Sequence, residues 1–169
     1  MNTSISSIIH FPRKKYLLHN SVFLFVDMQM EFLSSGRAYA LGNIENTIEG
    51  FQPFPNEMVF ERDQPSIYSN AAFSAFLESI YSPELFLIGL TGEKSCLSTV
   101  VECAHRKQNL TFIQDASASP SIGKLTEVES HDFVSEIISI YAEVITTKEL
   151  LSIIQRSPQL PGVKNEKRY

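Results

Sequence analysis

The stretch SVFLFVD, residues Ser21 to Asp27, decides the fold. Every side chain from Val22 to Val26 is apolar, so both faces of the strand that this run predicts are apolar. A strand of this kind is typical of the centre of a parallel sheet that is covered on both faces. We therefore expect residues 21–26 to form a central strand, with Asp27 at its carboxyl end.

Further apolar runs and helical patterns alternate along the rest of the chain. The runs that predict strands are Met58–Phe60, Leu85–Gly89, Leu110–Ile113 and Ala142–Ile145. The patterns that predict helices are 43–50, 70–80, 95–107, 131–141 and 147–154, with Asn70 and Thr147 as expected N-caps. Strands that alternate with helices indicate βαβ units. The sequence thus predicts an α/β fold, a Rossmann-like three-layer α/β/α sandwich with a mostly parallel sheet.

Length and composition are those of one globular domain. The chain has 169 residues, of which 43% are hydrophobic and 20% are charged. We expect a single domain over 1–169, with an N-terminal extension at 1–19 and a loose tail at 157–169. The net charge of −5 argues against a nucleic-acid partner, which would need a basic face. No apolar run approaches the roughly 18 residues of a membrane-spanning helix.

The cysteines and histidines predict neither a disulfide nor a metal site. Cys96 and Cys103 lie about two turns apart on one predicted helix, which is too far for a disulfide. Free thiols suit a reducing compartment, and the N-terminus lacks the order of a secretory signal, so we expect a cytoplasmic protein. The four histidines are scattered, and no glycine-rich phosphate loop is present. We expect no metal and no cofactor.

Polar residues at the ends of the apolar runs are the candidates for chemistry, because sites in such folds lie at the carboxyl ends of the strands. They are Asp27, Arg62, the loop 90–95 and Asp115. A carboxylate at the mouth of an apolar strand suits acid–base work, and a permanently charged arginine could fix an anionic substrate. The alternatives are a turn residue for Asp27 and a solvated arginine for Arg62.

The predicted helix that begins near Ser95 and Cys96 could also contribute. A helix start offers free N–H groups and the positive end of the helix dipole, which favour an anion. A cysteine there would react readily, whereas a serine is a poor nucleophile without an adjacent base. The alternative is an ordinary turn with Ser95 as its cap.

Three blocks of sequence in this order resemble the isochorismatase-like (cysteine hydrolase) superfamily. The blocks are 24–32, then 53–62 with 66–70, and 87–99. Asp115, His131 and residues 144–150 are similar to the closing pattern of the superfamily. The resemblance covers about residues 20 to 152, and the order and spacing of the blocks are more specific than any one block.

The resemblance implies a site in which the usual catalytic triad of Asp, Lys and Cys is altered. Asp27 stands at the position of the Asp, Arg62 at that of the Lys and Ser95 at that of the Cys. It also implies a substrate pocket with Phe32 and Tyr68 as apolar walls and Cys96 beside Ser95. Almost no residues lie between Ile48 and Pro53, where members of the superfamily carry a further strand, so we expect a shortened sheet.

The implied function is hydrolysis of a small, anionic metabolite by Asp27 acid–base chemistry, with Arg62 as an electrostatic clamp and no cysteine nucleophile. Isochorismatases proper resemble this arrangement and hydrolyse a vinyl ether. One alternative is an inactive homologue that acts as a binding or assembly subunit. A weaker alternative is a cysteine hydrolase that uses Cys96. We expect a homo-oligomer, because a shortened sheet exposes an edge and the superfamily forms dimers or larger assemblies.

Overall fold

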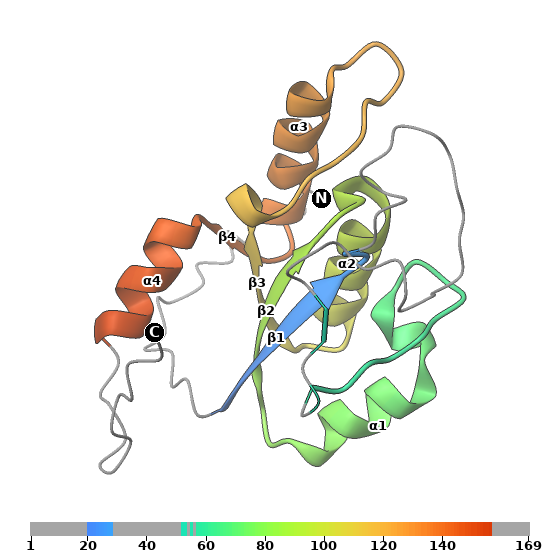
Figure 1. Cartoon of the computed structure of the whole chain (residues 1–169), viewed down its shortest axis with the longest axis vertical. Coiled ribbons are helices and arrows are strands. Elements are labelled where there is room, and N and C mark those ends of the chain that lie inside the picture. The colour runs from blue at the N-terminus through green and yellow to red at the C-terminus, as the bar shows by residue number, and fades with distance from the viewer. Residues whose placement is uncertain (1–19, 29–51, 54, 56, 157–169) are drawn as a thin grey trace, which may run out of the picture.

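The computed structural model describes residues 20–28, 52–53, 55 and 57–156, and these residues form an α/β fold (Figure 1). Its parallel sheet has the order β1-β2-β3-β4. The strands are β1 (Ser21–Val26), β2 (Glu84–Gly89), β3 (Asn109–Ile113) and β4 (Glu143–Ile145). The predicted parallel sheet is therefore confirmed, and the carboxyl ends of its strands share one edge.

Helices cover both faces of the sheet, as the three-layer prediction requires. They are α1 (Ala71–Ser79), α2 (Leu97–His105), α3 (Glu127–Ser139) and α4 (Thr147–Arg156). On one face, α1, α2 and α3 pack on a core that includes the paired residues Leu24, Leu87 and Phe112. On the other face, Leu150 of α4 packs in a smaller cluster with Phe86, Ile113 and Ile145. Burial of these apolar side chains drives the assembly of the layers.

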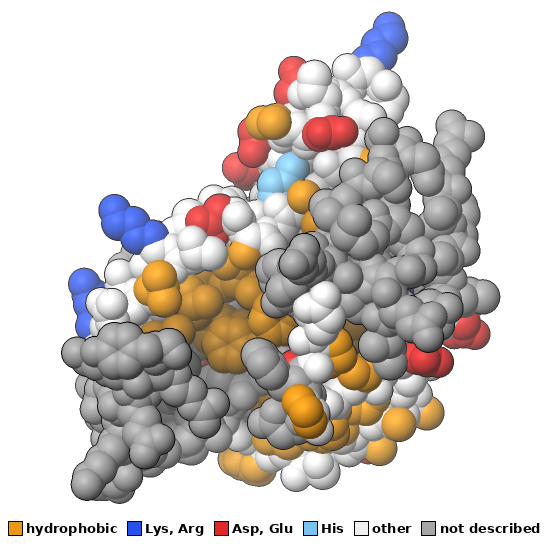
Figure 2. Space-filling view, viewed as in Figure 1, with side chains coloured by type: hydrophobic (Ala, Val, Ile, Leu, Met, Phe, Trp, Pro, Cys, Tyr) orange, Lys and Arg blue, Asp and Glu red, His pale blue; other side chains and the backbone are white. Residues whose placement is uncertain are grey.

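Strand β1 is an edge strand of the described sheet, not the central strand that its composition predicts. Leu24 and Val26 are buried against the helices, whereas Phe23 and Phe25 are 39% and 54% exposed. The difference arises because β2, β3 and β4 all lie on one side of β1. Helix α4 packs around Ile113 and Ile145 of β3 and β4, and not over β1. Figure 2 shows hydrophobic side chains gathered on this face beside α4.

The predicted strand at Met58–Phe60 is wrong. These residues are irregular, and Met58 and Val59 are 61% and 49% exposed. Phe60 packs its ring against Phe73 and Phe76 of α1, with ring centroids 5.4 and 5.9 Å away. The apolar character of the run therefore comes from contact with a helix and not from pairing in the sheet.

Side-chain caps set where the helices begin. Asn70 caps α1 as predicted. Helix α3 begins at Glu127, four residues before the predicted His131, because Thr126 and Glu129 form a capping box. Thr146, and not the predicted Thr147, makes the same reciprocal bonds with Glu149 at the start of α4.

Several predictions fall outside the described residues. These are the helix at 43–50, the extension 1–19, the tail 157–169 and the pocket wall Phe32. Within the described part of the chain, no helix is long and apolar enough to cross a membrane. The same residues contain no group of three or more His, Cys, Asp and Glu side chains that could hold a metal ion.

Candidate active site

Asp27, Arg62 and Ser95 meet at the carboxyl ends of β1 and β2. Asp27 follows β1 directly, and Ser95 lies in the π-helical turn η5 (Gly92–Cys96) between β2 and α2. The Asp27 carboxylate accepts one hydrogen bond from the Arg62 guanidinium and another from the Ser95 hydroxyl, at 2.5 Å. Arg62 Nη2 also lies 3.2 Å from Ser95 Oγ. Groups 35 and 68 positions from Asp27 in sequence thus share one carboxylate.

The ion pair at the centre of this cluster is largely enclosed. The side chains of Arg62 and Asp27 are 15% and 16% exposed, and Ser95 is buried. Water screens such a pair less than a pair on the open surface. Arg62 Nη1 donates to the Gln64 carbonyl at 2.7 Å, which holds the guanidinium in one orientation.

Thr91, within the candidate loop 90–95, is a further member of the cluster. Its hydroxyl donates to Asp27 Oδ2 at 3.0 Å, so the carboxylate has three donors. Asp27 and Thr91 both adopt left-handed backbone conformations, with φ of 55° and 53°. That region is tolerated by Asp but is strained for a β-branched residue. Thr91 lies in the loop 90–95, which follows a predicted strand, but no sequence motif distinguishes Thr91 from the other residues of this loop.

Backbone hydrogen bonds and a close contact at Gly92 hold the π-helical turn η5, which carries Ser95 and Cys96. The N–H groups of Lys94, Ser95 and Cys96 all lie within 3.4 Å of the Thr91 carbonyl, which closes the turn tightly. Gly92 N–H donates to the Ala118 carbonyl at 2.9 Å, and a Cβ on Gly92 would lie 2.5 Å from Ser119 Oγ. This close approach holds the turn in place against the loop after β3.

The Cys96 side chain does not join the Asp27 cluster, and its surroundings disfavour a role in the pocket or as a nucleophile. Its side chain is fully buried, and Sγ lies 3.8 Å from the Leu90 carbonyl. Burial raises the pKa of the Cys96 thiol well above its ordinary value, and the negative charges of Asp27 and Glu93 raise it further. The physical reason is the step of about 100° between neighbouring helical residues, which turns Cys96 into the core when Ser95 faces Asp27.

Tyr68 does not line this site either. It is buried, its hydroxyl donates to Gln108, and its ring packs against Phe73. The Arg106 guanidinium lies over the same ring, 4.5 Å from its centroid. Arg106 and Gln108 follow the C-terminal end of α2, whereas Ser95 precedes its N-terminal end. Tyr68 therefore stabilises the far end of α2.

Asp115, another strand-end residue, has a structural role in this fold. Its carboxylate accepts hydrogen bonds from the N–H and the hydroxyl of Thr147, both at 2.7 Å. His131 is engaged between Ser119 Oγ, at 3.3 Å from Nδ1, and the Gln114 carbonyl, at 2.8 Å from Nε2. Because a carbonyl can only accept, Nε2 carries a proton, and Nδ1 pairs with the Ser119 hydroxyl. Both residues connect elements and do not touch Asp27.

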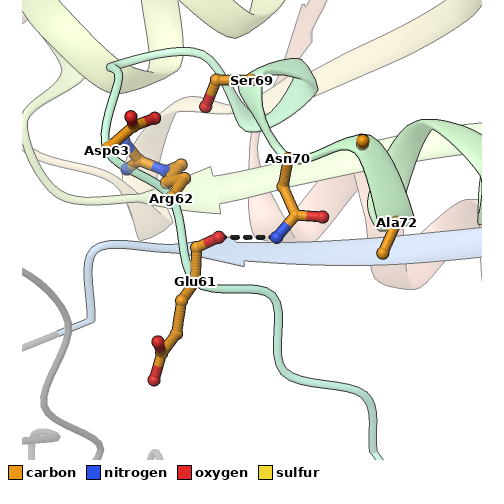
Figure 3. A pocket seen from close by; sticks show the side chains of 7 residues that line it. Glu61, Arg62, Asp63, Ser69, Asn70 and Ala72 are labelled. Atoms are coloured by element: carbon orange, nitrogen blue, oxygen red, sulfur yellow. Dashed lines mark hydrogen bonds between the residues drawn. The ribbon is translucent and has the colours of Figure 1, made fainter.

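An open hollow of about 660 Å³ adjoins the cluster at Arg62 (Figure 3). It lies at the start of α1, where Asn70 donates from its side-chain amide to the Glu61 carbonyl at 2.6 Å. Its lining consists of Glu61, Arg62, Asp63, Ser69, Asn70, Ala71 and Ala72. Arg62 thus connects the enclosed carboxylate to a space that could admit a small molecule.

Comparison with known proteins relates much of the chain to a known family. The model of the isochorismatase domain matches residues 43–149. The search of curated proteins found no match. Among solved structures, an isochorismatase from Pseudomonas putida KT2440 is similar with a TM-score of 0.68 and 19% identity, covering 83% of this chain and 93% of that one.

Two further solved structures share less of the fold. A cysteine hydrolase from Pseudomonas syringae pv. phaseolicola 1448A has a TM-score of 0.56 and 18% identity, and an isochorismatase-like hydrolase from Alkaliphilus metalliredigens has 0.53 and 17%. The similarity to the cysteine hydrolase covers 65% of this chain and 55% of that one. For the isochorismatase-like hydrolase, the two shares are 64% and 57%. At these identities, the similarity shows the fold.

Proposed function

Because the chain belongs to the isochorismatase family, whose domain model matches residues 43–149, we propose that it hydrolyses a small, anionic metabolite by acid–base chemistry at Asp27. The observation that carries the proposal is the shared hydrogen bonding of Asp27, Arg62 and Ser95 at the carboxyl ends of the strands. Ser95 acts as a hydrogen-bonding group that orients the carboxylate.

The surroundings of Ser95 and Cys96 favour a reaction without a covalent intermediate. The Ser95 hydroxyl donates to a carboxylate that Arg62 also binds, and such a carboxylate is a weak base for activating a hydroxyl. The Cys96 thiol is buried and its pKa is raised, so little thiolate forms near neutral pH. Amide hydrolysis through a thioester is therefore disfavoured.

The position of Arg62 supports an anionic substrate. Its hydrogen bonds go to Asp27, Ser95 and Gln64 and are made by its two terminal nitrogens. A guanidinium has five N–H donors in a planar fork, so further donors could bind a carboxylate in the adjoining hollow. Hydrolysis of a vinyl ether suits this site, because that reaction needs a proton delivered to carbon and a water molecule but no nucleophilic side chain.

The test is a turnover screen of small vinyl ethers and small amides, each with and without a carboxylate. We expect the wild-type chain to hydrolyse a carboxylated vinyl ether, and Asp27→Asn to lower kcat/KM by at least about 100-fold, the usual contribution of acid–base catalysis. Asp132→Asn, an exposed carboxylate on α3, is the matched control and should turn over normally.

Three outcomes separate the alternatives. Turnover that survives Asp27→Asn would remove Asp27 from the mechanism. Hydrolysis of amides in preference to vinyl ethers would contradict the proposed reaction type. A wild-type chain that hydrolyses nothing in the screen would favour the inactive homologue that binds or assembles with a partner.

A further inference from the structure

Four polar residues of α2 and its two ends lie in a row along one side of the helix. Their spacing of four, three and four positions is that of neighbours on one helical face, and they are Ser95, Thr99, Glu102 and Arg106. We call this row the α2 stripe. Ser95 belongs to the cluster around Asp27, whereas the function proposed above uses no other member of the stripe.

The segment 62–68, which begins with Arg62, runs along this stripe. Each member of the stripe contacts one residue of the segment. From the start of α2 to its end, the pairs are Ser95 with Arg62, Thr99 with Ile67, Glu102 with Ser66 and Arg106 with Tyr68. One helix therefore holds the segment of the guanidinium and also leads from the turn that carries Ser95.

The contact at Thr99 is closed to water. The Thr99 side chain is fully buried, and its Oγ1 accepts a hydrogen bond from the Ile67 N–H at 3.3 Å. A buried N–H group that loses its acceptor costs free energy, because water cannot take the place of that acceptor. The Thr99 hydroxyl thus fixes where the short turn η4 (Ile67–Ser69) lies against α2.

The Glu102 carboxylate joins the segment to the end of the stripe. Its Oε2 accepts from the Ser66 hydroxyl at 2.6 Å, and its Oε1 accepts from Arg106 Nη2 at 2.7 Å. Ser66 Oγ also accepts from the Tyr68 N–H at 3.3 Å and so caps η4. Burial raises the pKa of Glu102, but the hydrogen bonds from Ser66 and Arg106 outweigh it and lower that pKa, so Glu102 is an anion at neutral pH.

Arg62 relies on such contacts because it lies in an irregular part of the chain. Residues 57–66 form neither helix nor strand, so no regular backbone hydrogen bonding fixes the position of Arg62. Its side chain donates to the Gln64 carbonyl, two residues before Ser66. A shift of this stretch along α2 would therefore move the guanidinium relative to Asp27.

We propose that the α2 stripe positions Arg62 to bind the carboxylate of the substrate, with Thr99 and Glu102 as the positioning residues. The proposal rests on the proposed function, in which Arg62 is the electrostatic clamp. Neither positioning residue lines the hollow at Arg62, so both act through the segment 62–68. A merely structural role would instead lower the stability of the fold and leave the recognition of a carboxylate unchanged.

The first experiment measures KM for two vinyl ethers that differ only in a carboxylate. Thr99→Val removes the acceptor of the Ile67 N–H, and Glu102→Ala removes the acceptor of the Ser66 hydroxyl. In both variants, we expect KM for the carboxylated compound to rise about three- to tenfold, the effect of one lost hydrogen bond, and KM for the neutral compound to stay within about twofold of wild type. Thr99→Ser and Glu102→Gln keep an acceptor and should restore KM.

The second experiment follows the Arg62 guanidinium directly by nitrogen-15 NMR, with Arg62→Lys to assign its signals. Asp27 and Gln64 bind its two terminal nitrogens, so we expect slow rotation and separate signals for these nitrogens in wild type. Thr99→Val and Glu102→Ala should speed the rotation and merge the signals. Ser98→Ala, on α2 but outside the stripe, is the matched control for both experiments and should behave as wild type.

Two results would overturn the positioning role. One is a KM that stays at the wild-type value, or rises equally for both compounds, in Thr99→Val and Glu102→Ala. The other is a set of Arg62 signals that neither variant changes. In either case, Asp27-dependent turnover would still support the proposed function. A wild type without turnover would overturn the proposed function, and the NMR comparison would then decide by itself whether the stripe holds Arg62.

Discussion

At the scale of single residues, Thr91 shows how the site is held. Its left-handed backbone costs roughly 1–2 kcal/mol for a side chain with a branched Cβ. Its hydroxyl binds Asp27 at 3.0 Å, a contact that contributes about 1 kcal/mol. The strain and the contact are of similar size, which indicates that the conformation serves the carboxylate and not the stability of the fold.

Replacing Thr91 should therefore separate stability from activity. Thr91→Gly removes the strain and the hydroxyl together, so we expect the free energy of unfolding to stay within about 1 kcal/mol of wild type. Turnover should fall by at least about tenfold, because losing one donor to a charged carboxylate costs at least about 1.4 kcal/mol. Thr91→Ser keeps the hydroxyl and should keep most of the turnover. Urea denaturation and steady-state kinetics measure the two effects, and a Thr91→Gly variant that unfolds far more easily would contradict this account.

The burial of the two thiols gives a second test at this scale. Burial raises the pKa of Cys96 strongly and that of Cys103 to about 11, although a hydrogen bond with Tyr68 lowers the latter. In Cys103→Ser, which leaves Cys96 as the one thiol of the sequence, we expect almost no labelling by a thiol reagent at neutral pH until the chain is unfolded. Rapid labelling of the native variant, with an ordinary pKa, would return Cys96 to the candidate nucleophiles.

The sequence predicts the cluster only in part, for reasons visible in these residues. Asp27, Arg62 and Ser95 could be placed because strand ends and family motifs mark them. Thr91 could not, because nothing in a loop sequence reports a left-handed φ. The sequence does not show that Tyr68 lies away from the cluster, because an aromatic residue near a site motif can equally belong to the core, where this one packs.

At the scale of elements, the start of α1 connects helix capping to the site. Asn70 Oδ1 accepts from the Phe73 N–H at 2.9 Å, which caps the helix. The Asn70 amide nitrogen donates to the Glu61 carbonyl, in the residue before Arg62 (Figure 3). One side chain thus fixes both the helix and the segment that carries the guanidinium. The sequence predicts the Asn70 cap, whereas α3 begins earlier than its apolar pattern predicts because Thr126 and Glu129 form a capping box.

The two bonds of Asn70 can be removed separately. Asn70→Asp keeps the cap acceptor but cannot donate to Glu61, so stability should change little while KM for an anionic substrate rises. Asn70→Ala removes both bonds and should also lower the free energy of unfolding by about 1 kcal/mol. Thermal denaturation and steady-state kinetics distinguish the variants. An Asn70→Asp protein with wild-type KM would show that the Glu61 bond does not position Arg62.

At the scale of the whole molecule, the two faces of the sheet are covered unequally. Three helices pack on the face that carries Leu24 and Val26, while α4 packs on the other face around Ile113 and Ile145. Phe23 stacks on Phe86 with ring centroids 5.0 Å apart, yet remains 39% exposed. The sequence does not show this asymmetry. An apolar run predicts that both faces of a strand are covered, but it does not indicate which helices cover each face or how completely.

The position of β1 at the edge of the described sheet favours self-association, with a second copy of the chain as the partner. An edge strand with apolar side chains favours pairing, and Phe25 on this strand is 54% exposed. We expect a dimer or larger assembly in sedimentation at micromolar concentration. Phe25→Lys should shift it towards monomer, because a charge would have to be buried at the contact. Phe133→Lys, at a similarly exposed position on α3, should leave it intact. A monomeric wild type, or an assembly that Phe133→Lys dissociates and Phe25→Lys does not, would show that this edge is not the contact.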